Sequence, residues 1–147
     1  MLREALTRDL VATSLGARAK GDVIDELLTM LCSTGKVRDR AEALGDLLAN
    51  ERRTATGMQH GIAIPHAKTA AVDELIACVA VSSEGVDFGS VDRKPSRIFI
   101  MTLSPLDQTG PHLQFLSEVG RLLKHRKVRD RVLAAKTPDE VLHALLD

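Results

Sequence analysis

The chain of 147 residues is long enough for one layered core, and we expect a single domain over residues 1–147. Twenty basic and twenty acidic side chains cancel, so the composition disfavours nucleic acid and anionic membrane surfaces as partners. The apolar runs are too short to span a bilayer and no signal-peptide pattern opens the chain, so we expect a cytoplasmic protein without membrane insertion.

The first half of the chain is predicted to supply two helices and several short strand segments. Apolar residues recur at helical spacing from about residue 20 to 34, and Gly35 follows as a stop signal. A second helix is expected from about residue 39 to 49. Strand segments are assigned to Leu10–Leu15, Ala55–Met58 and Ile62–Ile64.

Two longer strands are predicted in the middle of the chain, at Leu75–Val81 and Arg97–Leu103. Both segments are apolar on both faces, which is typical of central strands that helices cover on each side. The intervening segment Glu84–Pro95 is rich in glycine and proline and is predicted to form turns. Cys32 and Cys78 stand among apolar neighbours, and we expect two buried free thiols.

The last third of the chain is predicted to be helical. Gly110-Pro111 opens a helix with Thr109 as a candidate cap. Its apolar stripe is marked by Leu113, Leu116, Val119 and Leu123. A shorter helix covers Val128–Ala135, and the capping-box pattern Thr137–Glu140 opens a final helix that runs through Leu146.

This order of elements predicts an α/β protein in which a mixed β-sheet is sandwiched between helices. Two helices come first, strands follow, and three helices end the chain. No internal repeat, low-complexity segment or interdomain linker is evident.

The most informative segment is Gly61–Ala67, a short apolar run that ends in Pro65 and then presents His66. Proline has no N–H for a sheet ladder, so we expect the chain to leave the sheet at Pro65. A neutral imidazole held at a strand end is a plausible nucleophile. The alternative is a buried turn with a hydrogen-bonded histidine and no chemistry.

Four segments together resemble a known family: Thr56–Met58, Gly61–Lys68, Val86–Phe88 with Pro95, and Asp107–Leu113. In these segments the chain is similar to the enzyme IIA phosphocarrier domains of the bacterial phosphotransferase system. The resemblance is to the fructose/mannitol-type branch, and within it above all to the nitrogen-regulatory IIA proteins. It implies the three-layer fold of mannitol-type IIA domains and a phosphotransferase activity without a cofactor.

The resemblance also assigns roles to two histidines. His66 is expected to accept a phosphoryl group from the phosphohistidine of an HPr-like carrier, and His112 is expected to be the second active-site histidine. The chemistry agrees, because a phosphoryl acceptor needs an unprotonated ring nitrogen and an environment that stabilises negative charge. A histidine in the first turn of a helix, as we predict for His112, suits the second need. Taken alone, His112 reads more simply as a residue that caps or packs.

Support for the phosphate site is assigned to Thr56, Thr109, Asn50, Arg52 and Arg53. Family members usually carry an arginine where this chain has Asn50, so we expect slow exchange or weak retention of phosphate. On an extended segment, Arg52 or Arg53 replaces that charge only if the backbone turns one of them inward. The resulting hypothesis is that Asn50→Arg accelerates transfer.

The remaining histidines and the basic residues near the C-terminus receive simpler interpretations. His60 is taken as a solvated loop residue, and His125 and His143 as surface residues. A zinc site from His60, His66 and His112 lacks a further ligand, so no metal is expected. A solvated face is the main interpretation of the basic cluster, and docking of an acidic partner is the second: Lys124, Arg126, Lys127, Arg129 and Arg131.

Three functions are compatible with this reading. The first is a nitrogen-regulatory type protein whose phosphorylation state selects a regulatory target protein, and we favour it. The alternative is the IIA component of a sugar-transporting system, which passes phosphate to the cysteine of a IIB domain. The third is a structural module that keeps only the fold, and the presence of both histidines argues against it.

Overall fold

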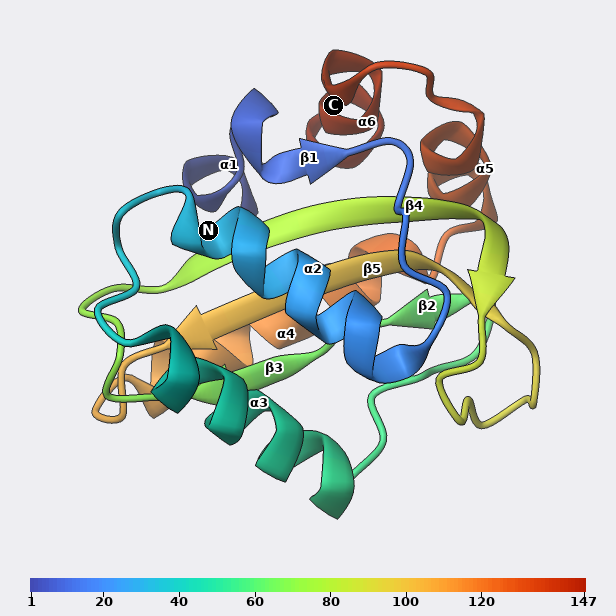
Figure 1. Cartoon of the computed structure of the whole chain (residues 1–147). Coiled ribbons are helices and arrows are strands. Elements are labelled where there is room, and N and C mark those ends of the chain that lie inside the picture. Colours follow the sequence, from blue (N-terminus) through green and yellow to red (C-terminus); the bar gives the residue numbers. More distant parts are fainter.

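A five-stranded mixed sheet forms the centre of the computed structural model, which describes all 147 residues (Figure 1). The strand order is β1-β4-β5-β2, and β3 also pairs with β5. The β4 and β5 strands are antiparallel, whereas β1 is parallel to β4 and both β2 and β3 are parallel to β5. The strands are β1 (Val11–Ala12), β2 (Ile62–Ala63), β3 (His66–Lys68), β4 (Ile76–Val86) and β5 (Ser96–Ser104).

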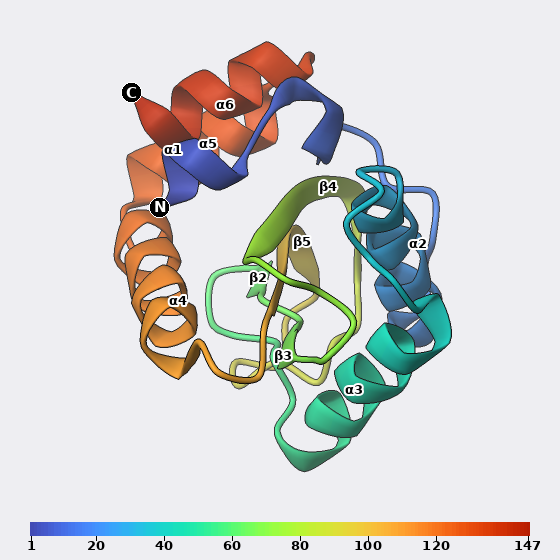
Figure 2. The same cartoon turned by 90° about the vertical axis from the view of Figure 1, so that its left-hand side faces the viewer.

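Helices cover both faces of this sheet, as Figure 2 shows most clearly. The helices α2 and α3 lie on one face, and α1, α4, α5 and α6 lie on the other. This arrangement confirms the predicted three-layer α/β fold. The helical elements are α1 (Leu2–Ala5), the 3-10 turn η1 (Arg8–Leu10), α2 (Lys20–Cys32), α3 (Arg40–Arg53), α4 (Thr109–Leu123), α5 (Arg126–Ala134) and α6 (Pro138–Leu146).

The central strands are apolar on both faces because each face meets a separate helical layer. Along β4, Cys78 and Ala80 belong to the 21-residue core cluster under α2 and α3. Their neighbours Val79 and Val81 belong to the 17-residue cluster under the other helices. Burial of each large apolar side chain contributes about 1.5–3 kcal/mol, so both layers stabilise the sheet.

The two cysteines are free, as predicted. Cys78 is fully buried in β4, and this burial raises the pKa of its thiol to about 12. Cys32 is only partly buried, at the end of α2. Cys78 therefore behaves as a small core residue and has no role as a nucleophile at neutral pH.

Several boundaries and helix faces differ from the prediction. The first strand is reduced to Val11–Ala12, and α1 and η1 precede it without having been predicted. In α4 the buried stripe contains Phe115, whereas Leu113 is 59% exposed. The predicted strand at 55–58 is absent, and Gly57 forms only an isolated bridge to Ala63. At the C-terminus the prediction is confirmed, since the Thr137 hydroxyl accepts a hydrogen bond from the Glu140 N–H.

The chain does not leave the sheet at Pro65, and that prediction is wrong. Pro65 interrupts the ladder for lack of an N–H, but its carbonyl still accepts a hydrogen bond from the N–H of Thr102 at 3.2 Å. The chain therefore stays beside β5, and His66 begins a second short strand on the same edge. His66 lies at the start of a strand, half-buried, rather than in a surface loop.

The predicted end of α3 is also wrong, because the helix continues one turn beyond residue 49 and ends at Arg53. Asn50, Arg52 and Arg53 are therefore helical, and the assumption of an extended segment with alternating side chains is wrong. On a helix, residues separated by three or four positions share a face. Arg53 consequently lies on the same side of α3 as Asn50, whereas Arg52 does not.

Gly57→Ala is expected to destabilise the protein by about 1–3 kcal/mol, because overpacking forces the backbone apart. A Cβ atom at Gly57 meets the Oγ of Ser90 at 2.7 Å and the carbonyl oxygen of Phe88 at 2.9 Å. Thermal unfolding measures the change. Gly45→Ala is the matched control, since Gly45 is exposed on α3 and an added Cβ meets no atom within 4 Å. This change should preserve or raise Tm, because alanine has a higher helix propensity than glycine. A Tm for Gly57→Ala at or above that of the wild type contradicts this packing.

No helix of this structure combines the length and apolar character that crossing a membrane requires.

Candidate active site

A pocket of about 270 Å³ lies between α3, β3 and the start of α4. Both predicted histidines line it. Four of the lining residues belong to α3 and recur at spacings of three and four positions, so they lie on one face of that helix: Asp46, Ala49, Asn50 and Arg53. The lining residues are Asp46, Ala49, Asn50, Arg53, His66, Ala67, Lys68, Leu106 and His112.

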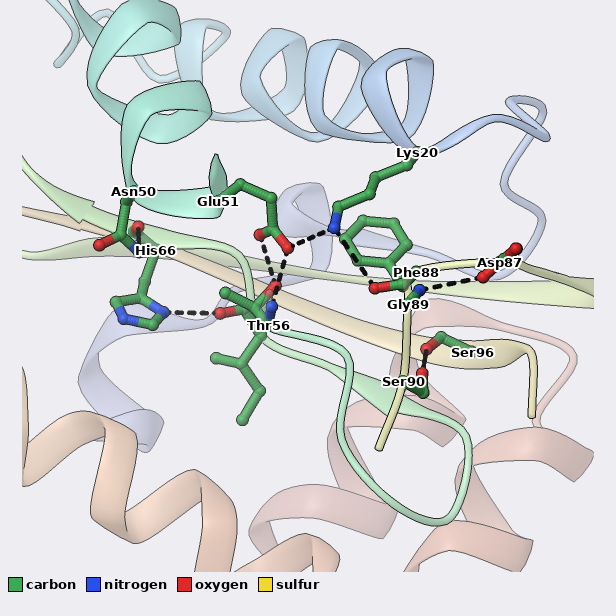
Figure 3. A network of polar contacts seen from close by, with 11 residues as sticks. Lys20, Asn50, Glu51, Thr56, His66, Asp87, Phe88, Gly89, Ser90 and Ser96 are labelled. Atoms are coloured by element: carbon green, nitrogen blue, oxygen red, sulfur yellow. Dashed lines mark hydrogen bonds and ion pairs between the residues drawn. The ribbon is translucent and has the colours of Figure 1, made fainter. Parts of the chain in front are cut away.

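His66 is held in one tautomer by the backbone. Its Nδ1 lies 2.7 Å from the carbonyl oxygen of Ile64, two residues earlier (Figure 3). A carbonyl oxygen only accepts hydrogen bonds, so Nδ1 carries the proton and donates it. In the neutral ring, Nε2 then has a free lone pair, and it has no hydrogen-bond partner in the protein.

The backbone of His66 is anchored to α3 through Asn50. The side-chain amide of Asn50 donates to the His66 carbonyl oxygen at 2.8 Å, across the open edge of the sheet (Figure 3). The Asn50 Oδ1 in turn accepts a hydrogen bond from the Arg53 guanidinium at 3.0 Å. Asn50 thus connects the strand that carries His66 with the guanidinium at the pocket.

Two cations line the pocket, Arg53 from α3 and Lys68 from β3. Lys68 is two residues after His66, so both side chains emerge from the same face of the strand. The Lys68 ammonium donates to the Thr109 hydroxyl at 2.8 Å. Thr109 is the first residue of α4 rather than its cap, which corrects the prediction; the N-cap residue is Gln108.

His112 is buried beside His66, with ring centroids 5.5 Å apart. Its Nδ1 lies 2.8 Å from the Oγ of Ser104, the last residue of β5. Burial, together with smaller contributions from the neighbouring cationic groups of His66, when protonated, and Lys68, lowers the pKa of His112 to about 4. His112 is therefore neutral at pH 7. The Ser104 hydroxyl can donate to Nδ1 or accept from it; in the first case the ring carries its proton on Nε2 and is a hydrogen-bond donor there.

The depressed pKa of His112 predicts a loss of stability in mild acid. In the unfolded chain the imidazole takes up a proton near pH 6.5, whereas the folded protein resists protonation until about pH 4. The free energy of unfolding should therefore decrease as pH falls from 6.5 to 4, and the decrease should reach roughly 3 kcal/mol at pH 4. Urea unfolding at several pH values measures it. The same pH dependence in His112→Gln contradicts the assignment.

Three residues that were assigned to the phosphate site are not part of the pocket lining: Thr56, Thr109 and Arg52. Thr56 is buried and its hydroxyl donates to the Glu51 carboxylate at 2.7 Å. Arg52 is exposed on α3 and forms no ion pair or side-chain hydrogen bond. His60 lies in an exposed loop with a φ of 67° and lines a different pocket, of about 460 Å³. No three His, Cys, Asp or Glu side chains are grouped as a metal site.

The other basic and histidine residues behave as surface groups. His125 and His143 are exposed, and the Nδ1 of His143 lies 2.7 Å from a carboxylate oxygen of Asp147. In the basic cluster, Arg129 donates to the carbonyl oxygens of Leu123 and Lys124 at the end of α4. Such helix-end contacts agree with the simpler interpretation of this cluster.

Sequence reasoning did not single out Lys68 or Ser104. The spacing of two residues between His66 and Lys68 was available as a signal, because it places both on one face of a strand. No local signal connected Ser104 with His112, since their contact depends on the loop between β5 and α4.

Comparisons with known proteins identify the family of the chain. The model of a family described as "Phosphoenolpyruvate-dependent sugar phosphotransferase system, EIIA 2" matches residues 4–147. The chain is 37% identical to the fructose-specific EIIA component of Haloferax volcanii, over 95% of this chain and 90% of that protein. It is 26% identical to a nitrogen regulatory protein of Pseudomonas aeruginosa, over 99% of this chain and 95% of the other.

Solved structures show the same fold. The nitrogen regulatory protein IIA-Ntr of Neisseria meningitidis superposes with a TM-score of 0.91 at 25% identity, covering 98% of both chains. IIA mannitol of Escherichia coli, solved in complex with phosphorylated IIB mannitol, superposes at 0.82 with 24% identity, covering 95% of this chain and 96% of that one. The chain belongs to the EIIA type 2 family of the phosphoenolpyruvate-dependent sugar phosphotransferase system.

Proposed function

We propose that this protein is a cytoplasmic phosphocarrier that accepts a phosphoryl group on Nε2 of His66 from an HPr-like phosphohistidine protein. One observation carries the proposal: the hydrogen bond from Nδ1 of His66 to the Ile64 carbonyl, which leaves Nε2 unprotonated in a pocket lined by cations. Membership of a phosphotransferase family supplies the class of reaction.

The transfer needs no cofactor. The lone pair of His66 Nε2 attacks phosphorus, the P–N bond to the donor histidine breaks, and its electron pair returns to the donor ring. The Nδ1 proton stays on His66 and continues to donate to Ile64. Because little covalent chemistry falls to the protein, the rate depends on positioning and on charge stabilisation.

The neighbouring side chains are suited to that stabilisation. The neutral ring of His112 offers an N–H to the phosphoryl oxygens, and Arg53 and Lys68 offer positive charge. Thr109 contributes by holding the Lys68 ammonium at the rim of the pocket. Thr56 acts at a distance, because its carbonyl oxygen accepts a hydrogen bond from the N–H of Ile64, the residue that binds the His66 ring.

His112→Ala is expected to slow phosphorylation of His66 without preventing it. Loss of one hydrogen bond to a charged oxygen costs about 1.5–3 kcal/mol, which corresponds to roughly ten- to a hundred-fold in rate. Rapid-quench labelling from a phosphorylated HPr measures the rate. His143→Ala, which removes an exposed histidine of α6, is the control. Wild-type kinetics in His112→Ala contradict its proposed role.

Two exposed leucines flank the pocket and offer a docking surface for the protein partners. Leu106 lines the pocket and is 60% exposed, and Leu113 follows His112 on α4 with a similar exposure. Protein surfaces that meet partners are enriched in apolar residues at their centre and polar residues at their rim. We propose that the HPr-like donor and the acceptor both dock here.

For the physiological role, the comparisons support two candidates. The 37% identity to a separate fructose-specific EIIA component favours onward transfer to a IIB domain, and it shows that such a component exists without a fused transport domain. The overlap with IIA-Ntr favours regulation of a target protein according to the phosphorylation state. We place sugar transport first, since the sequence identity to that relative is the higher.

Incubation with enzyme I, HPr and phosphoenolpyruvate, followed by intact-mass measurement, tests the phosphocarrier role. One added phosphoryl group is expected, and no added mass contradicts the proposal. Subsequent addition of a fructose-type IIB domain separates the two roles: rapid loss of the phosphoryl group supports transport, and persistence of the phosphorylated form supports regulation.

A further inference from the structure

A partly buried charged network lies behind His66 (Figure 3). Its centre is Glu51, in the last turn of α3, whose side chain is 6% exposed. The carboxylate accepts hydrogen bonds from the Thr56 N–H at 2.8 Å and the Thr56 hydroxyl at 2.7 Å. It also pairs with the Lys20 ammonium at 2.8 Å. An ion pair in which one partner is buried and the other is partly exposed adds little to stability by itself, so its position beside His66 suggests a role.

The network leads to the ring of His66 through two backbone links. The carbonyl oxygen of Thr56 accepts a hydrogen bond from the Ile64 N–H at 3.2 Å. The carbonyl of the same Ile64 accepts the Nδ1–H of His66 at 2.7 Å. Glu51 fixes Thr56, Thr56 fixes the peptide of Ile64, and Ile64 fixes the ring.

Lys20 connects this arrangement to a third part of the chain. It is the first residue of α2, and its ammonium also donates to the carbonyl oxygen of Phe88 at 3.3 Å and lies 5.2 Å from the Phe88 ring centre. The network therefore joins α2, α3 and the segment after β4 around the loop that precedes His66. Such outer contacts orient a reactive histidine by fixing the group that accepts its second N–H.

We propose that Glu51 is a positioning residue that sets the tautomer of His66 by holding Thr56 and, through it, the Ile64 carbonyl. The consequence for phosphoryl transfer rests on the proposed function of His66. The tautomer itself is a property of the unphosphorylated protein and is measurable without any transfer.

Glu51→Gln tests the proposal, because a single amide oxygen cannot accept from Thr56 and Lys20 as the two carboxylate oxygens do. Protein labelled with ¹⁵N-histidine reports by NMR which ring nitrogen of His66 carries the proton. We expect the Nδ1–H form in the wild type and a mixture of both tautomers in Glu51→Gln. The transfer rate from phosphorylated HPr should fall about tenfold or more, by analogy with the loss on removing the outer partners of metal-binding histidines.

Val141→Ala is the control for a general loss of stability, since Val141 is buried in α6 on the other face of the sheet. It should lower Tm and leave the tautomer of His66 unchanged. Thr56→Val removes only the hydroxyl that binds Glu51, and the tautomer of His66 is measured in this variant as well. If Glu51→Gln does not fold, the result for Thr56→Val tests the proposal. A wild-type tautomer in the folded variants overturns the proposal. Failure of the wild type to be phosphorylated instead rejects the proposed function and leaves the tautomer comparison valid.

Discussion

His66→Ala is expected to abolish phosphorylation of the chain while the fold persists. His66 is the ring in the pocket whose Nδ1 is fixed as a donor and whose Nε2 is free. The neighbouring His112 is buried, and its Nδ1 is engaged with the hydroxyl of Ser104 at 2.8 Å, so we expect it to assist the transfer and not to carry the phosphoryl group. Intact-mass measurement after incubation with the phosphorylated donor should show no added phosphoryl group, and circular dichroism should show an unchanged fold.

The wild-type adduct should also be acid-labile, as expected for a phosphorus–nitrogen bond. His60→Ala provides the matched control, because His60 is an exposed histidine that lines a separate pocket. It should be labelled fully. Undiminished labelling of His66→Ala, or an acid-stable phosphoserine or phosphothreonine, would reject the assignment.

The layered fold was predictable because the two central strands each contain an uninterrupted apolar run, at 76–81 and 98–101. The adjacent residues Ile98 and Phe99 of β5 belong to different core clusters, one on each face of the sheet. Both faces of the strand are therefore buried, and its sequence does not alternate between apolar and polar residues. The break between β2 and β3 was misjudged, since the pattern around Pro65 shows the missing N–H but not the carbonyl that keeps pairing with Thr102. Backbone acceptors leave no trace in a sequence pattern.

The pairing of His66 and His112 was expected from the family resemblance, but their geometry was not predictable. The tautomer of His66 depends on the Ile64 carbonyl, and the ring of His112 is held by Ser104. Both contacts arise from how loops close between elements. The last turn of α3 was missed for a different reason: apolar periodicity ends before residue 50, and the buried residue of that turn is the charged Glu51.

The position of Arg53 changes the expectation for the missing arginine of the family. With residues 50–53 helical, Arg53 lies one turn after Asn50, lines the pocket and donates to the Asn50 side chain at 3.0 Å. A guanidinium there offers charge-assisted, bidentate bonds to phosphoryl oxygens. Arg52 points elsewhere on the helix and is not part of the pocket lining. We therefore expect Arg53 to supply the positive charge that Asn50 lacks.

Arg53→Ala is expected to slow phosphoryl transfer to His66 by about a hundredfold or more, since two bonds to charged oxygens are each worth roughly 1.5–3 kcal/mol. Arg52→Ala, the adjacent control with the same change of charge, should transfer at nearly the wild-type rate. Asn50→Arg should bring little gain while Arg53 is present, but should recover much of the loss in the Arg53→Ala background. The four variants are compared by rapid-quench labelling from one phosphorylated donor. If Asn50→Arg accelerates transfer as strongly with Arg53 as without it, Arg53 does not fill the place of the family's arginine, and the site of the wild type is impaired.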